Sequence, residues 1–474
     1  MIELSRKHIR AIRTTIRQSL GFKSARLAPA ITLRATHNQL LIQAATQTIA
    51  LEYRLPGNTA PECMAVPYEA LTVSEGKQDD PVSFTKRDDT VIVQWTDKGI
   101  PQTRSFDAAD IVEMPQDPGQ FTSIERRFLA AMANAAETTD TESSRYALNC
   151  IRLRGSDGQI AATDSSQAFI ESGFAFPWQD AVLIPASDAF AATDFSGAEN
   201  VLIGRTEDWV SIQVNSCTLH LKIDKERRFP SIDLQIPTRG SAATTLALSD
   251  DDVDFLLTST KRLPGASEPN SPVTVDLNGV VAIRAAAADL TNSTELVLSN
   301  SRRMGDEVCF STNREFLNRA AELGFREIYL RNTEAPAYCQ DDRRTYIWAL
   351  LSGQDSIKGN SQTIRISSPV SSNPQTHKQR TTTVMTPYQP TTSQPTTSQP
   401  TTPRPVEARA ATTVNSEPDP TPSLLTQAEA LRDSLSRSLV DTRDLITLIK
   451  RNQKQNRLVE TTLQSLKQLE HIGA

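Results

Sequence analysis

The stretches MAVPYEALTV (64–73), VLIPASDAFAAT (182–193) and VCFSTNREFLNRAAEL (308–323) decide the fold, because they are three versions of one pattern. In each copy a short apolar strand runs into a brief helical stretch, and two apolar alternations separated by a polar turn follow. The copies lie 118 and 126 residues apart. Such a period is too long for the common solenoid repeats and matches the size of an ordinary domain. The sequence therefore predicts one domain used three times.

A second marker keeps the same period. Near Leu4, Thr122 and Leu248 a short strand passes into an amphipathic helix. Many short alternating segments lie between the helical ones, which predicts an α+β fold with mostly antiparallel sheet. Joints rich in proline and turn-forming residues place the three domains at 1–116, 117–238 and 239–353.

Composition narrows the class of protein. The chain has 474 residues, a net charge of −6 and a pI near 5.6, so it does not carry the basic shell of a protein that coats nucleic acid, although a local basic surface stays open. Its five cysteines are scattered without a CxxC pair, which indicates free thiols in a reducing compartment and neither a zinc site nor a disulfide framework. Without a signal-like segment or a membrane-length apolar run, we expect a soluble, cytoplasmic protein.

The C-terminal quarter has a different composition. Residues 354–420 are rich in Ser, Thr, Pro and Gln, which predicts a disordered linker; a mucin-like stalk would need secretion. Residues 421–470 repeat apolar positions at alternating spacings of three and four, which predicts a coiled-coil helix. That helix would either pack back on the body alone, self-associate or pair with a partner.

The first predicted helix has a basic face. Arg6, Arg10, Arg13 and Arg17 follow one another at i, i+4, i+7 and i+11, opposite an apolar stripe of isoleucine and leucine. Arginines in a row without interleaved acids suit contact with a phosphate backbone, without reading of bases. The competing interpretation is an ordinary solvated face.

Catalytic patterns are missing from the sequence. The five histidines are dispersed, and there is no P-loop, GxSxG, GxGxxG or HExxH motif. The polar cluster Thr163–Ser166 is best interpreted as an Asx-type turn after a strand. We therefore predict a non-catalytic protein that needs no cofactor and no metal.

Four stretches resemble the bacterial sliding clamp family, the beta subunit of DNA polymerase III. They are SRYALNCIRLRGSDGQIAATDSSQAFI (144–170), LKIDKERRFPSIDLQIP (221–237), FSTNREFLNRAAEL (310–323) and RRTYIWALLSG (343–353). The resemblance implies three tandem DNA-clamp domains and a head-to-tail homodimeric ring around duplex DNA. The basic helix would then face DNA, with Arg6, Lys7, Arg10, Arg13, Arg17 and Lys23 as the DNA-binding residues.

The resemblance also implies a pocket between domains 2 and 3 for short peptides of DNA polymerase, the clamp loader and repair proteins. Carried over to this chain, its walls are Leu148, Thr163, Ala168, Pro230, Ile347, Ala349 and Leu351. The turn after Asp164 lacks the family's Gly-His-Arg, and Gln235 stands where the family has an apolar residue. Pro264–Gly265 occupies the place of an aliphatic pair at the ring joint, which leaves ring closure open.

Two functions are compatible with these features. The first is a processivity factor that encircles duplex DNA without sequence specificity and tethers replication or repair proteins. The alternative is a clamp-fold interaction scaffold that no longer encircles DNA and oligomerises through its C-terminal helix.

Overall fold

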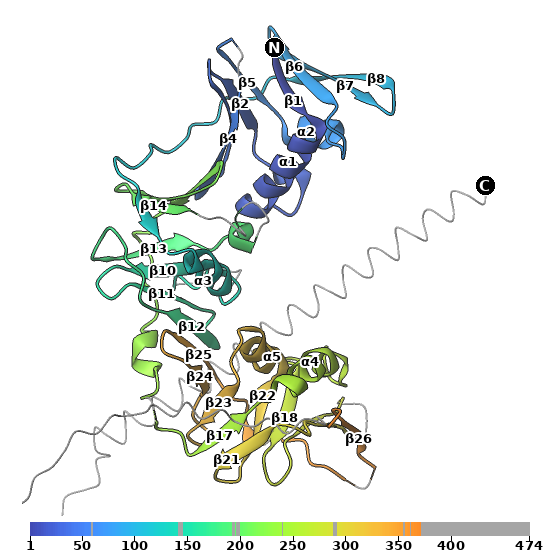
Figure 1. The fold of residues 1–474 in the computed structure, drawn as a ribbon, viewed down its shortest axis with the longest axis vertical. Coiled ribbons are helices and arrows are strands. Elements are labelled where there is room, and N and C mark those ends of the chain that lie inside the picture. Colours follow the sequence, from blue (N-terminus) through green and yellow to red (C-terminus); the bar gives the residue numbers. More distant parts are fainter. Residues whose placement is uncertain are drawn as a thin grey trace, which may run out of the picture. The chain divides into compact units, whose positions relative to one another are not determined.

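The computed structural model describes residues 1–370, except 58–59, 141–145, 192–194, 196–199, 239, 288–291, 354–355 and 361 (Figure 1). The chain divides into two compact units, Met1–Lys378 and Gln379–Ala474, and every described residue belongs to the first. The predicted coiled-coil helix at 421–470 lies outside the described residues, and so does the predicted linker from residue 371 onward.

The first repeat combines two helices with two antiparallel sheet segments. Its elements are β1 (Ile2–Ser5), α1 (Arg6–Leu20), η1 (Ala25–Leu27), β2 (Ile31–Ala35), β3 (Gln39–Ala45), β4 (Ile49–Pro56), β5 (Glu62–Val66), α2 (Tyr68–Ser74), β6 (Pro81–Arg87), β7 (Thr90–Asp97) and β8 (Ile100–Asp107). The strand orders are β5-β2-β3-β4 and β1-β6-β7-β8.

The second repeat has the same plan. Its elements are β9 (Thr122–Ile124), α3 (Arg127–Ala136), β10 (Cys150–Arg154), β11 (Gln159–Thr163), β12 (Gln167–Glu171), β13 (Ala181–Pro185), η2 (Asp188–Ala191), β14 (Val201–Arg205), β15 (Trp209–Val214), β16 (Cys217–Lys222) and the connecting η3 (Ile232–Gln235). The strand orders are β13-β10-β11-β12 and β9-β14-β15-β16.

The third repeat follows it once more, with one added edge strand, β21. Its elements are β17 (Thr244–Ala247), α4 (Asp250–Ser259), η4 (Thr260–Arg262), β18 (Pro272–Asp276), β19 (Ala282–Ala285), β20 (Thr294–Val297), β21 (Arg302–Gly305), β22 (Cys309–Asn313), α5 (Arg314–Glu322), β23 (Glu327–Leu330), β24 (Ala337–Gln340) and β25 (Arg344–Trp348). The orders are β22-β18-β19-β20 and β21-β17-β23-β24-β25. The mixed α+β class is confirmed.

Helix α1 shows how the sequence sets the local structure. The side-chain oxygen of Ser5 accepts a hydrogen bond from the His8 amide and caps the first turn, and Gly21 ends the helix with a φ of 67°. Ile9, Ile12 and Ile16 are each 1% exposed, so the predicted apolar stripe is the buried face.

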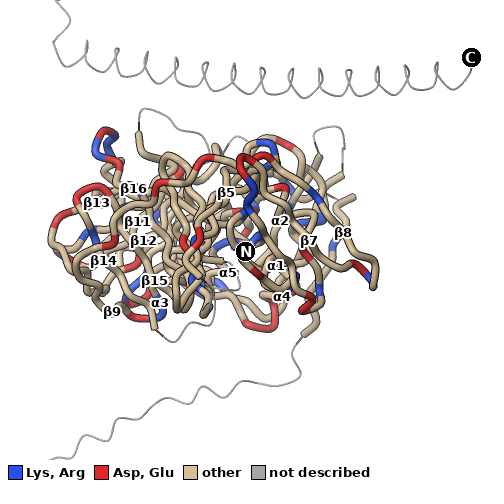
Figure 2. Tube along the Cα trace, turned by 90° about the horizontal axis from the view of Figure 1, so that it is seen from above, with Lys and Arg blue, Asp and Glu red and all other residues tan. Residues whose placement is uncertain are grey.

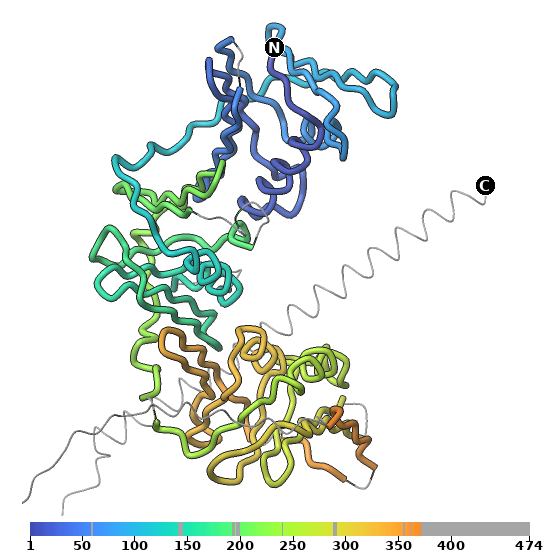
Figure 3. Tube along the Cα trace, viewed as in Figure 1, coloured from blue at the N-terminus to red at the C-terminus, as the bar shows by residue number. Residues whose placement is uncertain are grey.

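Adjacent repeats are joined edge to edge through backbone hydrogen bonds. β4 pairs antiparallel with β16, and β12 pairs antiparallel with β25. The first joint makes an eight-stranded sheet and the second a nine-stranded sheet. Figure 3 shows such neighbours distant in sequence, as the green β12 lies beside the orange β25. At each joint the last strand of one sheet order pairs with the last strand of the other, with the orders written as above.

The ordered part of the chain extends past residue 353, where we expected the linker to begin. Ile364–Ser367 form a further strand, β26, which pairs parallel with β20 at the edge of the third repeat. The prediction from composition was wrong at this point, because IRIS is a short β-compatible run that gains partners only from an edge remote in sequence.

A buried arginine holds the loop at Pro264–Gly265. The Arg314 guanidinium donates hydrogen bonds to the carbonyl oxygens of Leu263 at 2.8 Å and Pro264 at 2.6 Å. Burial lowers the pKa of Arg314. These bonds tie the loop to the start of α5.

None of the described helices is both long and apolar enough to cross a membrane. None of the five cysteines forms a disulfide, and Cys150, Cys217 and Cys339 are buried.

Candidate functional sites

The arginines of α1 do not form one free stripe. Arg6 is folded into its own repeat, since its side chain is only 11% exposed and bonds to Asp97 at 2.9 Å. It also donates to the backbone oxygens of Ser74, Glu75 and Thr96. This guanidinium links α1 to α2 and β7, so its hydrogen-bonding groups are used within the repeat.

Arg13 is engaged in a similar way. Its side chain forms an ion pair with Glu75, and both partners are about three-quarters buried. Burial lowers the pKa of Arg13, but the hydrogen bond and charge of Glu75 outweigh this and raise it above its usual value. Arg13 therefore has a structural partner, contrary to the expectation that all four arginines contact a ligand.

Arg10 and Arg17 are the exposed remainder of the predicted face. Both lie on the solvent side of α1 two turns apart, and neither forms an ion pair with any residue that the structure describes. Lys7 is exposed and approaches Asp79 only at 4.0 Å, while Lys23 is exposed just beyond the helix. Residues Lys7, Arg10, Arg17 and Lys23 are called the α1 basic face below.

Helices of the other repeats present less exposed positive charge, with Arg126 at the N-cap of α3 and Arg262 in η4 as exposed basic residues. α4 opens with Asp250, Asp251 and Asp252, so its first turn is acidic. In the second repeat Arg127 is held by Glu125 and Glu171 and lies over the Phe174 ring at 3.9 Å. Figure 2 shows basic and acidic positions interspersed along the described trace. Positive charge free to bind is thus most clearly seen on α1.

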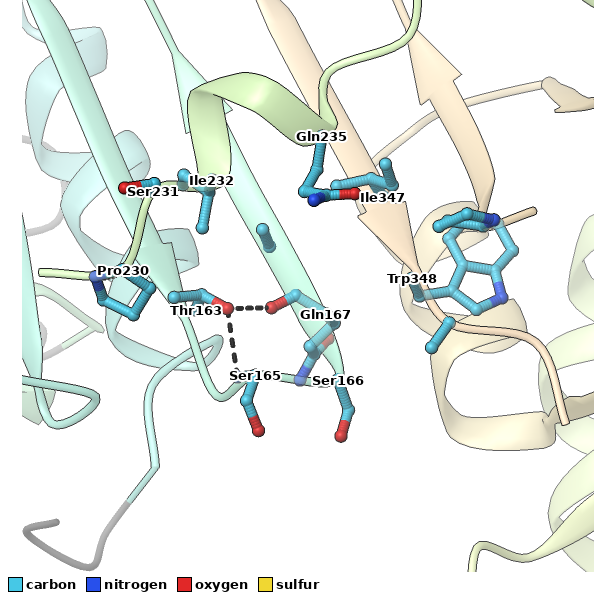
Figure 4. Close-up of a pocket in the computed structure, with 13 residues that line it drawn as sticks. Thr163, Ser165, Ser166, Gln167, Pro230, Ser231, Ile232, Gln235, Ile347 and Trp348 are labelled. Atoms are coloured by element: carbon cyan, nitrogen blue, oxygen red, sulfur yellow. Dashed lines mark hydrogen bonds between the residues drawn. The ribbon is translucent and has the colours of Figure 1, made fainter. Parts of the chain in front are cut away.

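A pocket of about 360 Å³ lies at the joint between β12 and β25 (Figure 4). Five predicted wall residues line it: Thr163, Ala168, Pro230, Ile347 and Ala349. The floor comes from paired strands, since Ala168 is opposite Ile347 in the ladder. Gln235 of η3 also lines the pocket, with its side chain beside Ile347 in Figure 4.

Two predicted residues are not in the lining, and other residues were missed. Leu148 is buried within the second repeat, and the Leu351 amide is bonded to the Ser311 oxygen of β22. The lining instead includes Ile232, Pro336 and Trp348. Ile232 was within reach of sequence reasoning, because it follows Pro230 by two positions; Pro336 was not, because its loop reaches the pocket only through the β23–β24 hairpin.

The pocket rim is a turn built from its own polar side chains. The Asp164 carboxylate accepts the amides of Ser166 at 2.7 Å and Gln167 at 2.8 Å, and also the Gln167 side-chain amide. Thr163 Oγ1 donates to the Gln167 backbone oxygen at 2.6 Å and accepts the Ser165 amide. The Asx-type turn predicted at Thr163–Ser166 is confirmed. The arrangement leaves no base beside either serine hydroxyl among the described hydrogen bonds.

Ser165 adopts a φ of 79°, in the left-handed region that costs a residue with a Cβ about 1 kcal/mol relative to glycine. We expect Ser165→Gly to raise the free energy of unfolding by up to about 1 kcal/mol, because the side-chain strain disappears while the Asp164 and Thr163 bonds remain. Chemical denaturation monitored by tryptophan fluorescence measures the change. Ser166→Gly, next to it and without a positive φ, is the control; equal effects of the two changes would contradict strain at Ser165.

Comparisons with known proteins agree on the fold and give no match by sequence. No protein-family model matches the chain, and no curated protein matches it. Among solved structures, the chain is similar to the DNA polymerase III subunit beta of Pseudomonas aeruginosa, with a TM-score of 0.60 and 16% identity. The beta subunits of Streptococcus pyogenes and Thermotoga maritima give TM-scores of 0.60, with 13% and 12% identity.

Each of these matches covers 74% of this chain and 99% of the solved structure. The similarity thus takes in nearly the whole of each beta subunit. At identities of 12–16%, it is the arrangement of the strands and helices that is shared. The described part of this chain therefore has the fold of the bacterial sliding clamp.

Proposed function

We propose that this chain is a divergent sliding clamp, a processivity factor that surrounds duplex DNA and holds partner proteins on it. The observation that carries the proposal is the match over 99% of the beta subunits together with an exposed basic face on α1. The chain supplies three repeats, so two copies would be needed for a six-repeat ring. Its part would be mechanical: the described residues form a platform without a recognisable catalytic constellation.

The proposed DNA contact runs through the α1 basic face. Exposed arginine and lysine side chains on a helix bind phosphate oxygens without distinguishing bases, and the attraction weakens with added salt as counterions compete. Since Arg6 and Arg13 already have carboxylate partners, the contact surface is smaller than the sequence alone indicated. Weak electrostatic contact suits a protein that is meant to slide.

We expect Arg10→Ala/Arg17→Ala to weaken binding of the full chain to duplex DNA equally for unrelated sequences. The slope of log affinity against log salt should become shallower by about 2, one unit for each arginine that no longer meets a phosphate. Fluorescence anisotropy over a salt series measures both effects. Lys86→Ala/Arg87→Ala removes the same charge from exposed positions of β6 in the first repeat and serves as the control. An unchanged slope in the α1 variant would exclude these two side chains from DNA binding.

The pocket at the β12–β25 joint is the proposed attachment point for a short peptide with apolar anchors. Ile232, Ile347 and Pro230 provide apolar walls of the kind that such anchors need. Gln235 places an amide beside Ile347, and an apolar ligand that covers this amide must strip its water. We propose that this residue weakens binding of purely apolar anchors and favours a peptide that offers a hydrogen bond.

The change Gln235→Leu removes that amide, so we expect a peptide carrying leucine and phenylalanine to bind about tenfold more tightly, which corresponds to about 1.4 kcal/mol. Isothermal titration of a synthetic pentapeptide into the full chain measures the dissociation constants. Gln78→Leu, an exposed position outside the pocket, controls for added surface apolarity. If Gln235→Leu and Gln78→Leu bind the peptide equally, the pocket is not its site.

Encirclement is tested by topology. A linear duplex with cohesive ends is ligated into a circle in the presence of the full chain, so that no loading machinery is required, and the product is filtered at high salt. We expect protein to stay with the circle and to leave when a restriction enzyme opens it. Equal loss from circular and linear DNA would contradict encirclement and favour the scaffold alternative.

A further inference from the structure

The two internal joints show which edges of a repeat are made for joining. At the first joint, β4 of the first repeat pairs antiparallel with β16 of the second; at the next, β12 pairs antiparallel with β25. β4 and β12 are equivalent, because each follows two antiparallel neighbours in its own repeat and lies at the end of that order. By the same order, β20 is their equivalent in the third repeat, and β8 is the equivalent of β16 and β25.

β20 and β8 are therefore the unmatched halves of a third joint. They belong to the last and first repeats, so a joint between them in the manner of the other two would connect two copies of the chain. β8 ends the order β1-β6-β7-β8 with no further described strand paired to it, and most of its side chains are exposed. Pro101 lies within β8 opposite Thr96 of β7. Because proline has no N–H, its nitrogen must be on the side of β8 that points away from β7. Thr103 and Ser105, at the same parity, then direct their amides outward.

The β20 edge, in contrast, is occupied from within the chain. β26 runs parallel to β20, with Glu295 opposite Arg365 and Leu296 opposite Ile366. The Ile364 amide is bonded to the Ser293 oxygen at 3.0 Å and the Ser368 amide to the Val297 oxygen at 2.9 Å. An edge strand normally leaves its outward N–H and C=O groups free to pair with another chain. Here β26 of the same chain pairs with these groups of β20.

Polar side chains secure β26 at both ends. The Arg365 guanidinium donates to one oxygen of Glu295 at 2.6 Å, and Arg284 of the neighbouring strand donates to the other oxygen at the same distance. Glu295 is a buried carboxylate at 2% exposure, so each guanidinium compensates for its lost hydration. Near the other end, Ser368 Oγ donates to buried Asp252 at 2.5 Å. These contacts identify β26 as a built part of the third repeat.

We infer that β26 is an intramolecular cap on the β20 edge, in competition with β8 of a second copy of this chain. Both strands would pair with the same outward N–H and C=O groups of β20, and β26 adds the ion pair between Arg365 and Glu295. Pairing of β26 opposes the head-to-tail joint without abolishing it, because a copy in which β26 has left β20 regains the free edge that the other two joints use. This inference rests on the proposed function in one respect, the head-to-tail pairing of two copies. It does not depend on DNA binding.

The test releases β26 from β20 by reversing a charge on β26. In the full-length chain, Arg365→Glu sets a carboxylate against buried Glu295, while Lys358→Glu makes the same charge change at an exposed position before β26. Light scattering over a concentration series gives the dimer dissociation constant. Hydrogen exchange of residues 364–367 reports whether β26 has been released. We expect Arg365→Glu to dimerise at least tenfold more tightly than the wild type and Lys358→Glu to behave like the wild type.

Ser105→Pro, added to Arg365→Glu, removes an outward amide of β8 and should abolish the gain. This second change separates the edge joint from any association through residues 371–474. Deletion of 363–370 opens the edge without a new charge and should reproduce the gain if Arg365→Glu leaves β26 paired.

Three results would overturn the inference. One is an unchanged dissociation constant in a variant whose β26 exchange is fast or whose β26 has been deleted. Another is a gain that survives Ser105→Pro. The last is a wild-type dimer that depends on Ser105 while β26 stays protected, because β26 itself would then be the joining strand. If light scattering shows the expected changes in dimerisation but the protein is not retained selectively on circular DNA, the result counts against DNA encirclement and not against the β26 cap.

Discussion

Unpaired backbone groups at sheet edges are the constraint on which this structure depends. Each repeat ends in strands whose N–H and C=O groups need partners, and exposed edges invite pairing with other chains. Four edges are satisfied at the two joints between repeats, where β4 pairs with β16 and β12 with β25. The edge of β20 is satisfied by β26, and the outer edge of β8 has no described partner strand. The linkage of repeats, the position of the pocket and the proposed control of assembly all follow from how these edges are matched.

The pocket illustrates this dependence. Its floor exists only because β12 and β25 form one ladder, which brings Ala168 of the second repeat opposite Ile347 of the third. Pro230 and Ile232 reach it from the connection between these repeats, and the turn at Asp164 forms its rim. The pocket therefore depends on the β12–β25 register, because a slip of that register would move its wall residues apart.

Arginine serves two different purposes in the molecule. Arg6, Arg13 and Arg314 are enclosed and satisfy carboxylates or backbone carbonyls, so they stabilise the position of a helix or a loop. Arg10 and Arg17 remain exposed on α1 and keep their charge available. Burial and nearby carboxylates separate the two groups, although the residues alternate along one helix. The net basic character of a helix therefore overstates what it can offer to an anionic ligand.

The sequence by itself determined the repeat, the mixed α+β class, the apolar face of α1 and the turn at Thr163–Ser166, because these depend on local periodicity and on side chains that bond to their own backbone. It also located five residues of the pocket, through a resemblance that preserves their order along the chain. Only the tertiary structure decided that Arg6 and Arg13 are paired, that Leu148 and Leu351 lie outside the pocket lining, and that β26 closes the β20 edge. The physical reason is the same in each case: Asp97, Glu75, Ser311 and Glu295 are distant in sequence, and contacts with them arise only when the repeats pack and their edges meet.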